Sequence, residues 1–164
     1  MRSFTPHVTV AAVIADNHCF LLVEERNRIA PSDERTVFNQ PAGHLEAGES
    51  LLAAMQRETL EESGWHVIPE SYLGLYINTA PNGVVYHSHT FIARPEQQVT
   101  RTLDEGIIGA DWFTLEEIQT LEQAGRLRSP LVARRICDAL AGHRHPLSLI
   151  CDLDHPAMDQ ASKR

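Results

Sequence analysis

The stretch GHLEAGESLLAAMQRETLEESGW, from Gly43 to Trp65, decides how this chain folds. A loop that contains glycine leads into a predicted helix, and the helix carries Glu58, Glu61 and Glu62. At 3.6 residues per turn, the three carboxylates fall on one face within an arc of roughly 100°. Carboxylates this close repel one another. A hard divalent cation reverses that repulsion, since Mg²⁺ prefers oxygen ligands and commonly joins a few carboxylates to substrate phosphates.

Local signals predict the two ends of this helix. Ser50 is a residue type that caps helix N-termini, and Gly64 is one that ends helices, so the helix is expected from about residue 50 or 51 to residue 63. An apolar stripe beside the acidic face is expected to face the core, and it consists of Leu51, Leu52, Met55 and Thr59.

Upstream of the helix, the chain reads as strands and a loop. Residues 8–14 and 19–24 are apolar and rich in β-branched side chains, and Asp16-Asn17 between them predicts a hairpin turn. Residues 26–36 contain Pro, Ser and Asp and are expected to form a surface loop. Residues 37–40 are expected to be extended.

Downstream of the helix, a second hairpin is predicted. The runs 72–79 and 84–93 flank Asn82-Gly83, which is a strong hairpin signal. We expect residues 95–102 to form a polar loop and residues 109–113 to form the last strand.

Two further helices are expected near the C-terminus. Thr114 and Glu117 have the spacing of a capping box for a short helix that ends at about residue 123. Ser129-Pro130 predicts the start of another helix, which Gly142 can end. Residues 143–150 are expected to be extended and to pack back on the fold. The mixed order of hairpins and helices predicts the α+β class.

Length and composition restrict the class of protein. We expect one domain over residues 1–150 and a partly mobile tail over 151–164. The net charge of −8 argues against binding to nucleic acid polymers or anionic membranes. An odd number of cysteines, three, favours reduced thiols and a cytoplasmic protein, and no apolar run is long enough to span a membrane. The lack of a long apolar surface stripe favours a monomer.

The spacing of charged and glycine residues in the opening stretch, GX5EX7REXXEEXG, resembles the Nudix box. It covers Gly43, Glu49, Arg57 and the three helical carboxylates, and only Thr59 departs from the usual aliphatic residue. The resemblance implies the Nudix fold, in which a mixed β-sheet lies between helices. It also implies hydrolysis of a phosphoanhydride in a nucleoside diphosphate linked to another group, with Mg²⁺ or Mn²⁺ as cofactor.

The same resemblance implies a role for each matching position. Glu58, Glu61 and Glu62 correspond to the metal ligands, and the carbonyl of Ala42 often joins them. Glu49 and Arg57 correspond to the pair that braces the loop against the helix.

Segments outside the box resemble the NudJ-type phosphatases of this family. They are PHVTVAAVI, VFNQPAGHLEAGESL, LRSPLVA and HPLSLI, and together they span most of residues 6–150. The resemblance implies stepwise phosphate release from nucleoside tri- and diphosphates, and hydrolysis of hydroxymethylpyrimidine pyrophosphate, a thiamine precursor.

Several residues outside the box have two open interpretations. Asp104 and Glu105 are candidates for a further metal ligand or the general base, or they form a solvated acidic loop. Asn39, Gln40 and His44 flank the metal loop and can bind substrate, but hydrogen bonds that cap the loop explain them equally well.

Several basic and histidine side chains outside the box also have two possible interpretations. Arg26 and Arg28 can meet phosphates or remain solvated, and Arg128 either approaches the site from the last helix or favours the start of that helix. His87 and His89 share a strand face but lack a third metal ligand.

Two alternative functions remain. One is a different Nudix specificity, such as ADP-ribose or a dinucleoside polyphosphate. The other is a binding module that senses a nucleotide without hydrolysing it; such modules usually lose box carboxylates, and this chain keeps them.

Overall fold

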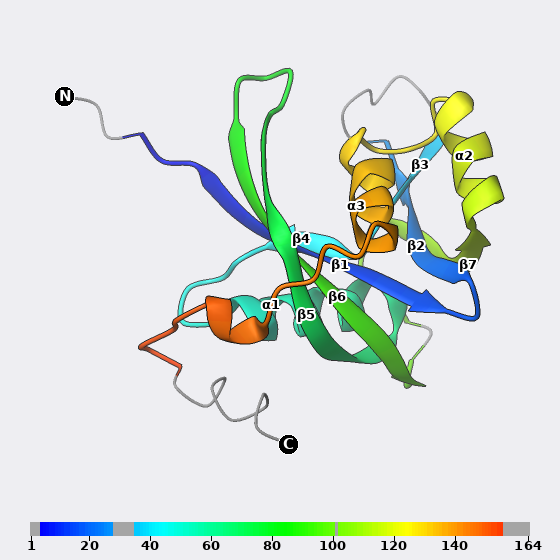
Figure 1. Ribbon diagram of the computed structural model, residues 1–164. Coiled ribbons are helices and arrows are strands. Elements are labelled where there is room, and N and C mark those ends of the chain that lie inside the picture. The colour runs from blue at the N-terminus through cyan, green and yellow to red at the C-terminus, as the bar shows by residue number, and fades with distance from the viewer. Residues whose placement is uncertain (1–3, 28–34, 101, 156–164) are drawn as a thin grey trace.

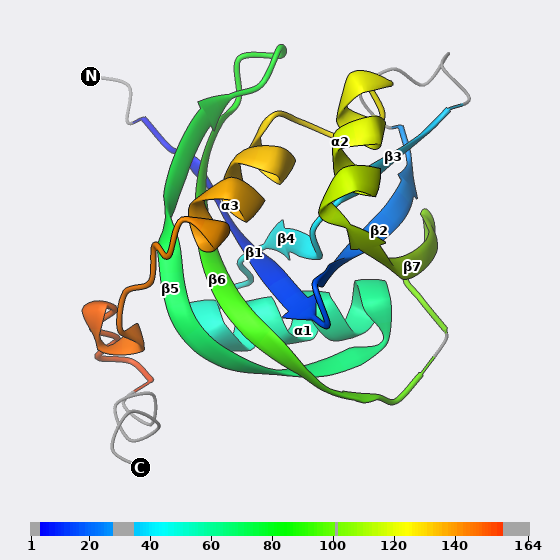
Figure 2. The same ribbon diagram turned by 45° about the vertical axis from the view of Figure 1, so that its right-hand side comes forward.

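The computed structural model describes residues 4–27, 35–100 and 102–155. Its strands form a seven-stranded mixed sheet. Figure 2 shows helix α1 (Leu51–Ser63) on one side of the strands, and α2 (Leu115–Gln123) and α3 (Leu131–Leu140) on the other. The prediction of an α+β fold with a mixed sheet between helices is confirmed.

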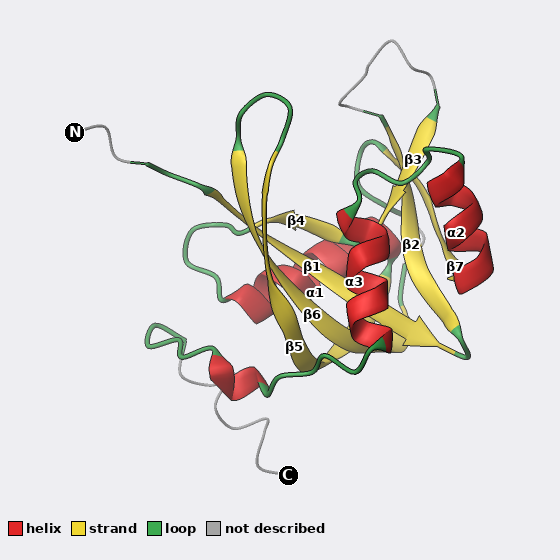
Figure 3. Ribbon diagram, turned by 45° about the horizontal axis from the view of Figure 1, so that its top comes forward, coloured by secondary structure: helices red, strands yellow, loops and turns green. Residues whose placement is uncertain are grey.

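One part of the sheet is built around a parallel pair of strands. Strand β1 (His7–Asp16) runs parallel to β6 (Val85–Gln98), which pairs antiparallel with β5 (Trp65–Thr79). On its other edge, β1 pairs antiparallel with the short strand β4 (Ala42–His44). The predicted Asn82-Gly83 hairpin therefore forms, and it projects from the body of the protein in Figures 1 and 3.

The other part of the sheet is centred on β2 (Cys19–Arg26), which pairs with β3 (Thr36–Asn39) and β7 (Ile107–Thr114). The β1–β2 hairpin is present, but only the two pairs next to its turn form. Beyond them the strands diverge, because each finds other partners along the rest of its length.

The helix ends follow the predicted signals. The Ser50 side chain accepts a hydrogen bond from the Ala53 N–H, and Gly64 adopts φ 75° just after α1. Thr114 and Glu117 form both halves of the capping box of α2. Helix α3 begins one residue later than the Ser129-Pro130 signal predicted, because Pro130 itself is the N-cap residue, and the Ser129 hydroxyl accepts from the Leu131 N–H.

Alternation along β1 separates two hydrophobic clusters. Val10, Ala12 and Ile14 point toward α1, while Val13 points toward α3. The α1 cluster includes Leu52, Met55 and Phe91, and the α3 cluster includes Phe20, Ile92, Val132 and Ile136. Both faces of the central strands are therefore covered.

Two of the predicted segments, the polar loop 95–102 and the extended segment 143–150, were wrong in part. The segment 95–102 is not all loop, since β6 continues to Gln98 and pairs with the first residues of a longer β5, Trp65 opposite Gln98. In residues 143–150, only an isolated bridge between Tyr72 and His145 is strand-like, and Leu147–Leu149 forms a 3₁₀ turn. Local propensity did not reveal either long-range partner. Among the helices of the described chain, none is long and apolar enough to cross a membrane.

Candidate active site

Gly43 brings the loop backbone into direct contact with Glu58. A Cβ atom at this position would lie 2.0 Å from the carboxyl carbon of Glu58 and about as close to both its oxygens. Gly43 pairs with Val10, whose side chain faces α1, so the missing side chain of the glycine would point at the helix. Only glycine leaves room for the Glu58 carboxylate against the loop.

Arg57 ties the loop to the helix through a hydrogen-bonded network. Its Nε and Nη2 atoms donate to the two oxygens of Glu49 at 3.1 and 2.7 Å. Its Nη1 atom donates to Glu58 at 2.9 Å and to Glu61 at 3.1 Å. A further bond runs from Nη2 to the carbonyl oxygen of His44 at 3.0 Å. One guanidinium thus contacts the loop backbone, the residue before the helix N-cap and two helical carboxylates.

The hydrogen bonds of this network shift the pKa values of Glu49 and Arg57. Hydrogen bonding to Arg57 is the largest cause that lowers the pKa of Glu49, so this carboxylate is ionised at neutral pH. Hydrogen bonding to Glu49 is the largest cause that raises the pKa of Arg57. The fork geometry of the guanidinium makes such paired bonds stronger than those of an ammonium group.

Glu62 is held beside the loop in a different way. Its Oε2 atom accepts the N–H of Ala42 at 2.9 Å. Burial is the largest cause that raises the pKa of Glu62, to about 8, and the nearby charges of Glu25 and Glu58 act in the same direction. Burial also raises the pKa of Glu58. Burial therefore makes the ionised form of both carboxylates less favourable than it is in water.

Glu25, on β2, belongs to the same cluster and was missed in the sequence. Its residue exposure is 8%, and its buried Oε1 atom has no hydrogen-bond partner in the described part of the chain. Its Oε2 atom pairs with Nη1 of Arg128 at 2.8 Å. Glu25 directly follows the predicted strand 19–24, and no local pattern distinguishes it from an ordinary residue at a strand end.

Arg128 contacts the carboxylate cluster through its ion pair with Glu25, and it does so from outside the last helix. It lies in the turn before α3, where its N–H donates to the carbonyl oxygen of Phe38 at 2.9 Å. Its charge contributes to lowering the pKa of both Glu62 and His44. Arg128 is therefore the positive charge that the structure pairs directly with Glu25 of the cluster.

The carboxylates suit a divalent cation, although they are not gathered into a ready metal cluster. In the described chain, no three Asp, Glu, His or Cys side chains are grouped closely enough to form a metal site. The Nη1 atom of Arg57 lies between two of the predicted ligands, where it binds Glu58 and Glu61 at once. The hard oxygen donors, the raised pKa of Glu62 and the unpartnered oxygen of Glu25 fit Mg²⁺ or Mn²⁺.

The loop before β7 lies next to the acidic helix. The N–H of Asp104 donates to the carbonyl oxygen of Glu61 at 3.0 Å, and the charge of Asp104 contributes to raising the pKa of Glu58. Glu105 is next to it in sequence and forms contacts of its own. The fold thus brings Asp104 to the cluster from a distant part of the chain.

The predicted substrate-binding residues differ in how deeply their side chains are buried. Gln40 differs from the expectation, because it is 1% exposed and its side chain donates to the carbonyl oxygen of Val132. Asn39 is half-buried on β3 opposite Val23, and Arg26 is exposed at the end of β2. His44 is exposed at the end of β4, and Arg28 lies outside the described residues.

The two histidines on β6 do not form a metal pair. His89 exchanges a hydrogen bond with the Tyr72 hydroxyl at 3.0 Å, and burial lowers its pKa. Among described side chains, no third ligand joins His87 and His89.

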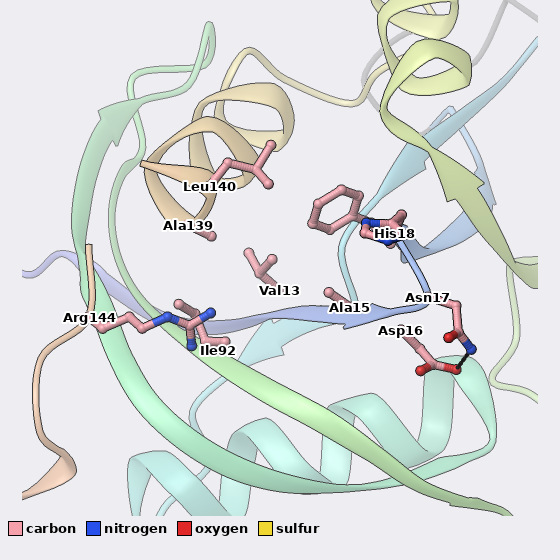
Figure 4. A pocket seen from close by; sticks show the side chains of 10 residues that line it. Val13, Ala15, Asp16, Asn17, His18, Ile92, Ala139, Leu140 and Arg144 are labelled. Carbon is pink, nitrogen blue, oxygen red and sulfur yellow. Dashed lines mark hydrogen bonds between the residues drawn. The ribbon is translucent and has the colours of Figure 1, made fainter. Parts of the chain in front are cut away.

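A cavity of about 320 Å³ lies elsewhere, between the β1–β2 turn and the end of α3. Figure 4 shows its lining, which includes Val13, His18, Ile92, Leu140 and Arg144. None of the box residues lines this cavity. The carboxylate cluster, and not this hollow, is the candidate active site.

Comparisons with known proteins agree with this assignment. The sequence profile of the NUDIX domain matches residues 5–134. The chain is 39% identical over 154 residues to proteins named phosphatase NudJ from Escherichia coli strain K12 and from Shigella flexneri. Each alignment covers 93% of this chain and 95% of the relative.

Solved structures show the same fold. A NUDIX hydrolase from Nitrosomonas europaea matches with a TM-score of 0.84 and 42% identity, and the match covers 92% of this chain and 99% of the other. A UDP-X diphosphatase matches with a TM-score of 0.65 at 17% identity, over 88% of this chain and 68% of the other. The second likeness supports the fold alone.

Proposed function

Because this chain belongs to the Nudix hydrolase family, we propose that it is a magnesium-dependent phosphatase that releases phosphate stepwise from nucleoside tri- and diphosphates. We include hydroxymethylpyrimidine pyrophosphate among the proposed substrates. The observation that carries the proposal is the set of buried and half-buried carboxylates around Gly43, which combine with the likeness to the NudJ phosphatases.

The proposed metal ligands are Glu58, Glu61, Glu62 and the carbonyl oxygen of Ala42. A divalent metal bound there would neutralise phosphate oxygens and lower the pKa of a bound water. Mg²⁺ is the proposed ion and Mn²⁺ a substitute, since both prefer oxygen donors.

The residues of the chain then have separate tasks. Arg57 orients Glu58 and Glu61 by direct hydrogen bonds and fixes the loop through Glu49 and the carbonyl oxygen of His44. Arg128 provides a positive charge next to the carboxylates, where a phosphate group would need one. A carboxylate must accept the proton of the attacking water. Asp104, Glu105 and the buried Glu25 are the candidates for this base.

Phosphate release tests the proposal. Purified protein is assayed with GTP, GDP and hydroxymethylpyrimidine pyrophosphate, with Mg²⁺, with Mn²⁺ and with a chelator. We expect orthophosphate from all three substrates with Mg²⁺ and none with the chelator. Conversion of ADP-ribose to AMP and ribose phosphate, in place of these reactions, would favour the other Nudix specificity. Nucleotide binding without turnover of any phosphoanhydride would favour the binding module.

We further propose that the protein is a cytoplasmic monomer. All three cysteines are free, as expected of thiols in a reducing compartment. Sedimentation at micromolar concentration tests the monomer, and a stable dimer would contradict it.

A further inference from the structure

Three aromatic rings gather beside the metal loop, from three different strands. The rings of His7 and His44 lie 5.6 Å apart, those of His7 and Tyr86 5.5 Å apart, and those of His44 and Tyr86 6.2 Å apart, measured between centroids. Their planes are inclined by 57° to 67°. We call His7, His44 and Tyr86 the ring cluster.

Strand register explains why these side chains meet. His7 is the parallel partner of Tyr86 between β1 and β6, so the two side chains share a face of the sheet. His44 is opposite Thr9, and Thr9 is two residues from His7 on the same face. The pairing of β1 with both β6 and β4 therefore brings the three rings together.

The ring cluster does not belong to the hydrophobic core. His7 and His44 are exposed and Tyr86 is half-buried, and none of the three is a member of either core cluster. Another ring pair, Phe38 and Phe113, packs within the core on the α3 side. Burial of apolar surface against the core therefore does not account for the ring cluster.

The ring cluster adjoins the proposed catalytic residues. His44 follows Gly43, which contacts Glu58, and the His44 carbonyl oxygen accepts a hydrogen bond from Arg57. Arg128 is close enough to influence both His44 and Glu62. A substrate whose phosphates lie at the carboxylates can thus extend along the backbone of Gly43 and His44 to the rings.

We propose that the ring cluster stacks against the heteroaromatic ring of the phosphorylated substrate, with His7 and Tyr86 as specificity-determining residues. The inference rests on the proposed function, because the substrates named there carry such a ring next to a chain of phosphates. Stacking on aromatic side chains accepts many bases, since every base has a π face. The ring cluster thus selects ring-bearing phosphates and tolerates different bases.

Binding without catalysis tests the ring cluster. The full-length protein is titrated with GMP, and in parallel with ribose 5-phosphate, which lacks the ring, while the imidazole and phenol C–H resonances are followed by NMR. We expect GMP to shift the resonances of His7, His44 and Tyr86, and ribose 5-phosphate to leave them in place. Equal shifts with both ligands would overturn the inference, because the phosphate alone would then be responsible.

Variants sharpen the test. Loss of one stacking partner is worth roughly a tenfold weakening of binding, so His7→Leu and Tyr86→Leu are each expected to raise the Kd for GMP and the KM for GTP about tenfold. Tyr86→Phe keeps the ring and is expected to restore binding. The matched control is His87→Leu, since His87 is next to Tyr86 but lies on the opposite face of β6.

The outcomes separate this inference from the proposed function. If GTP is hydrolysed and the leucine variants keep the wild-type KM, the ring cluster only packs against itself and the inference is wrong. If no phosphoanhydride is hydrolysed but GMP still shifts the three rings, the proposed function is wrong and the ring-binding site stands.

Discussion

The guanidinium of Arg57 holds both carboxylate oxygens of Glu49, with N–O distances of 3.1 and 2.7 Å. Glu49 precedes the acidic helix and also accepts the N–H of Glu46 at 2.8 Å. The pair therefore fixes the end of the loop relative to the helix. The remaining nitrogen of Arg57 orients Glu58 and Glu61, so loop position and carboxylate position depend on one side chain.

Arg57→Lys should show whether activity depends on the positive charge of residue 57 or on the hydrogen-bonding geometry of its guanidinium. An ammonium group retains the charge, but it cannot hold two oxygens of Glu49 and two further carboxylates in a fixed fork. We expect kcat for GTP to fall about 10- to 100-fold, because small displacements of catalytic groups are costly. Arg134→Lys is the matched control, since Arg134 also binds both oxygens of its partner, Asp138, but its side chain is exposed on α3. Equal loss of kcat in the two variants would contradict the prediction.

Gly43→Ala should displace Glu58. The new methyl group would meet the Glu58 carboxylate at 2.0 to 2.2 Å, so the carboxylate or the loop must move. We expect loss of most phosphatase activity and a destabilisation of about 1–3 kcal/mol, as for other overpacked sites. Chemical denaturation and kinetics measure the two effects. Gly109→Ala is the control, because no atom lies within 4 Å of a Cβ built there. Wild-type activity in Gly43→Ala would show that phosphatase activity does not depend on the observed position of the Glu58 carboxylate.

Mg²⁺ should stabilise the protein through Glu62. At about one hundred times its Kd, a ligand that binds only the folded state adds ~2.7 kcal/mol to the free energy of unfolding. Burial disfavours the ionised form of Glu62, and glutamine cannot ionise, so Glu62→Gln should be more stable than wild type without metal but gain little from Mg²⁺. Its kcat should fall about 100-fold or more.

Thermal melts with Mg²⁺ and with a chelator measure the effect on stability. Glu122→Gln, on the exposed surface of α2, is the control and should respond to Mg²⁺ as wild type does. A full Mg²⁺ response in Glu62→Gln would remove Glu62 from the metal site.

His89 should make the protein sensitive to acid. Burial, and then the charge of His87, lowers the pKa of His89 below 6.5, so the folded state binds this proton less readily than the unfolded chain. The stability contributed by neutral His89 is therefore fully present above pH 6.5 and is lost as the pH falls through the lower, folded-state pKa. In His89→Gln, whose side chain can still hydrogen-bond to Tyr72, the free energy of unfolding should fall less steeply below pH 6.5 than it does in wild type.

Urea denaturation at a series of pH values measures this difference. His66→Gln is the control, because His66 is exposed on β5. If the two variants show the same pH dependence, His89 is not the responsible group.

Most predictions made from local sequence signals are confirmed. Ser50 and Gly64 bound α1, the capping box of Thr114 and Glu117 begins α2, and Asn82-Gly83 turns the β5–β6 hairpin. Each signal acts within a few residues, and its physical cause lies in the backbone hydrogen bonds or dihedral angles of that segment. The box spacing likewise identified the acidic helix and the family, because its residues all lie within a single loop and helix.

What the sequence by itself determined is thus the local elements, the acidic face of α1 and membership of the Nudix hydrolase family. Only the tertiary structure decided that Glu25 and Arg128 join Glu62, that Gln40 turns inward, and that His7 meets Tyr86. The parallel pairing of β1 with β6 joins residues that are distant in the chain, and no local pattern encodes its register. Long-range strand pairing and core packing select these contacts together, so they become visible only when the whole chain is folded.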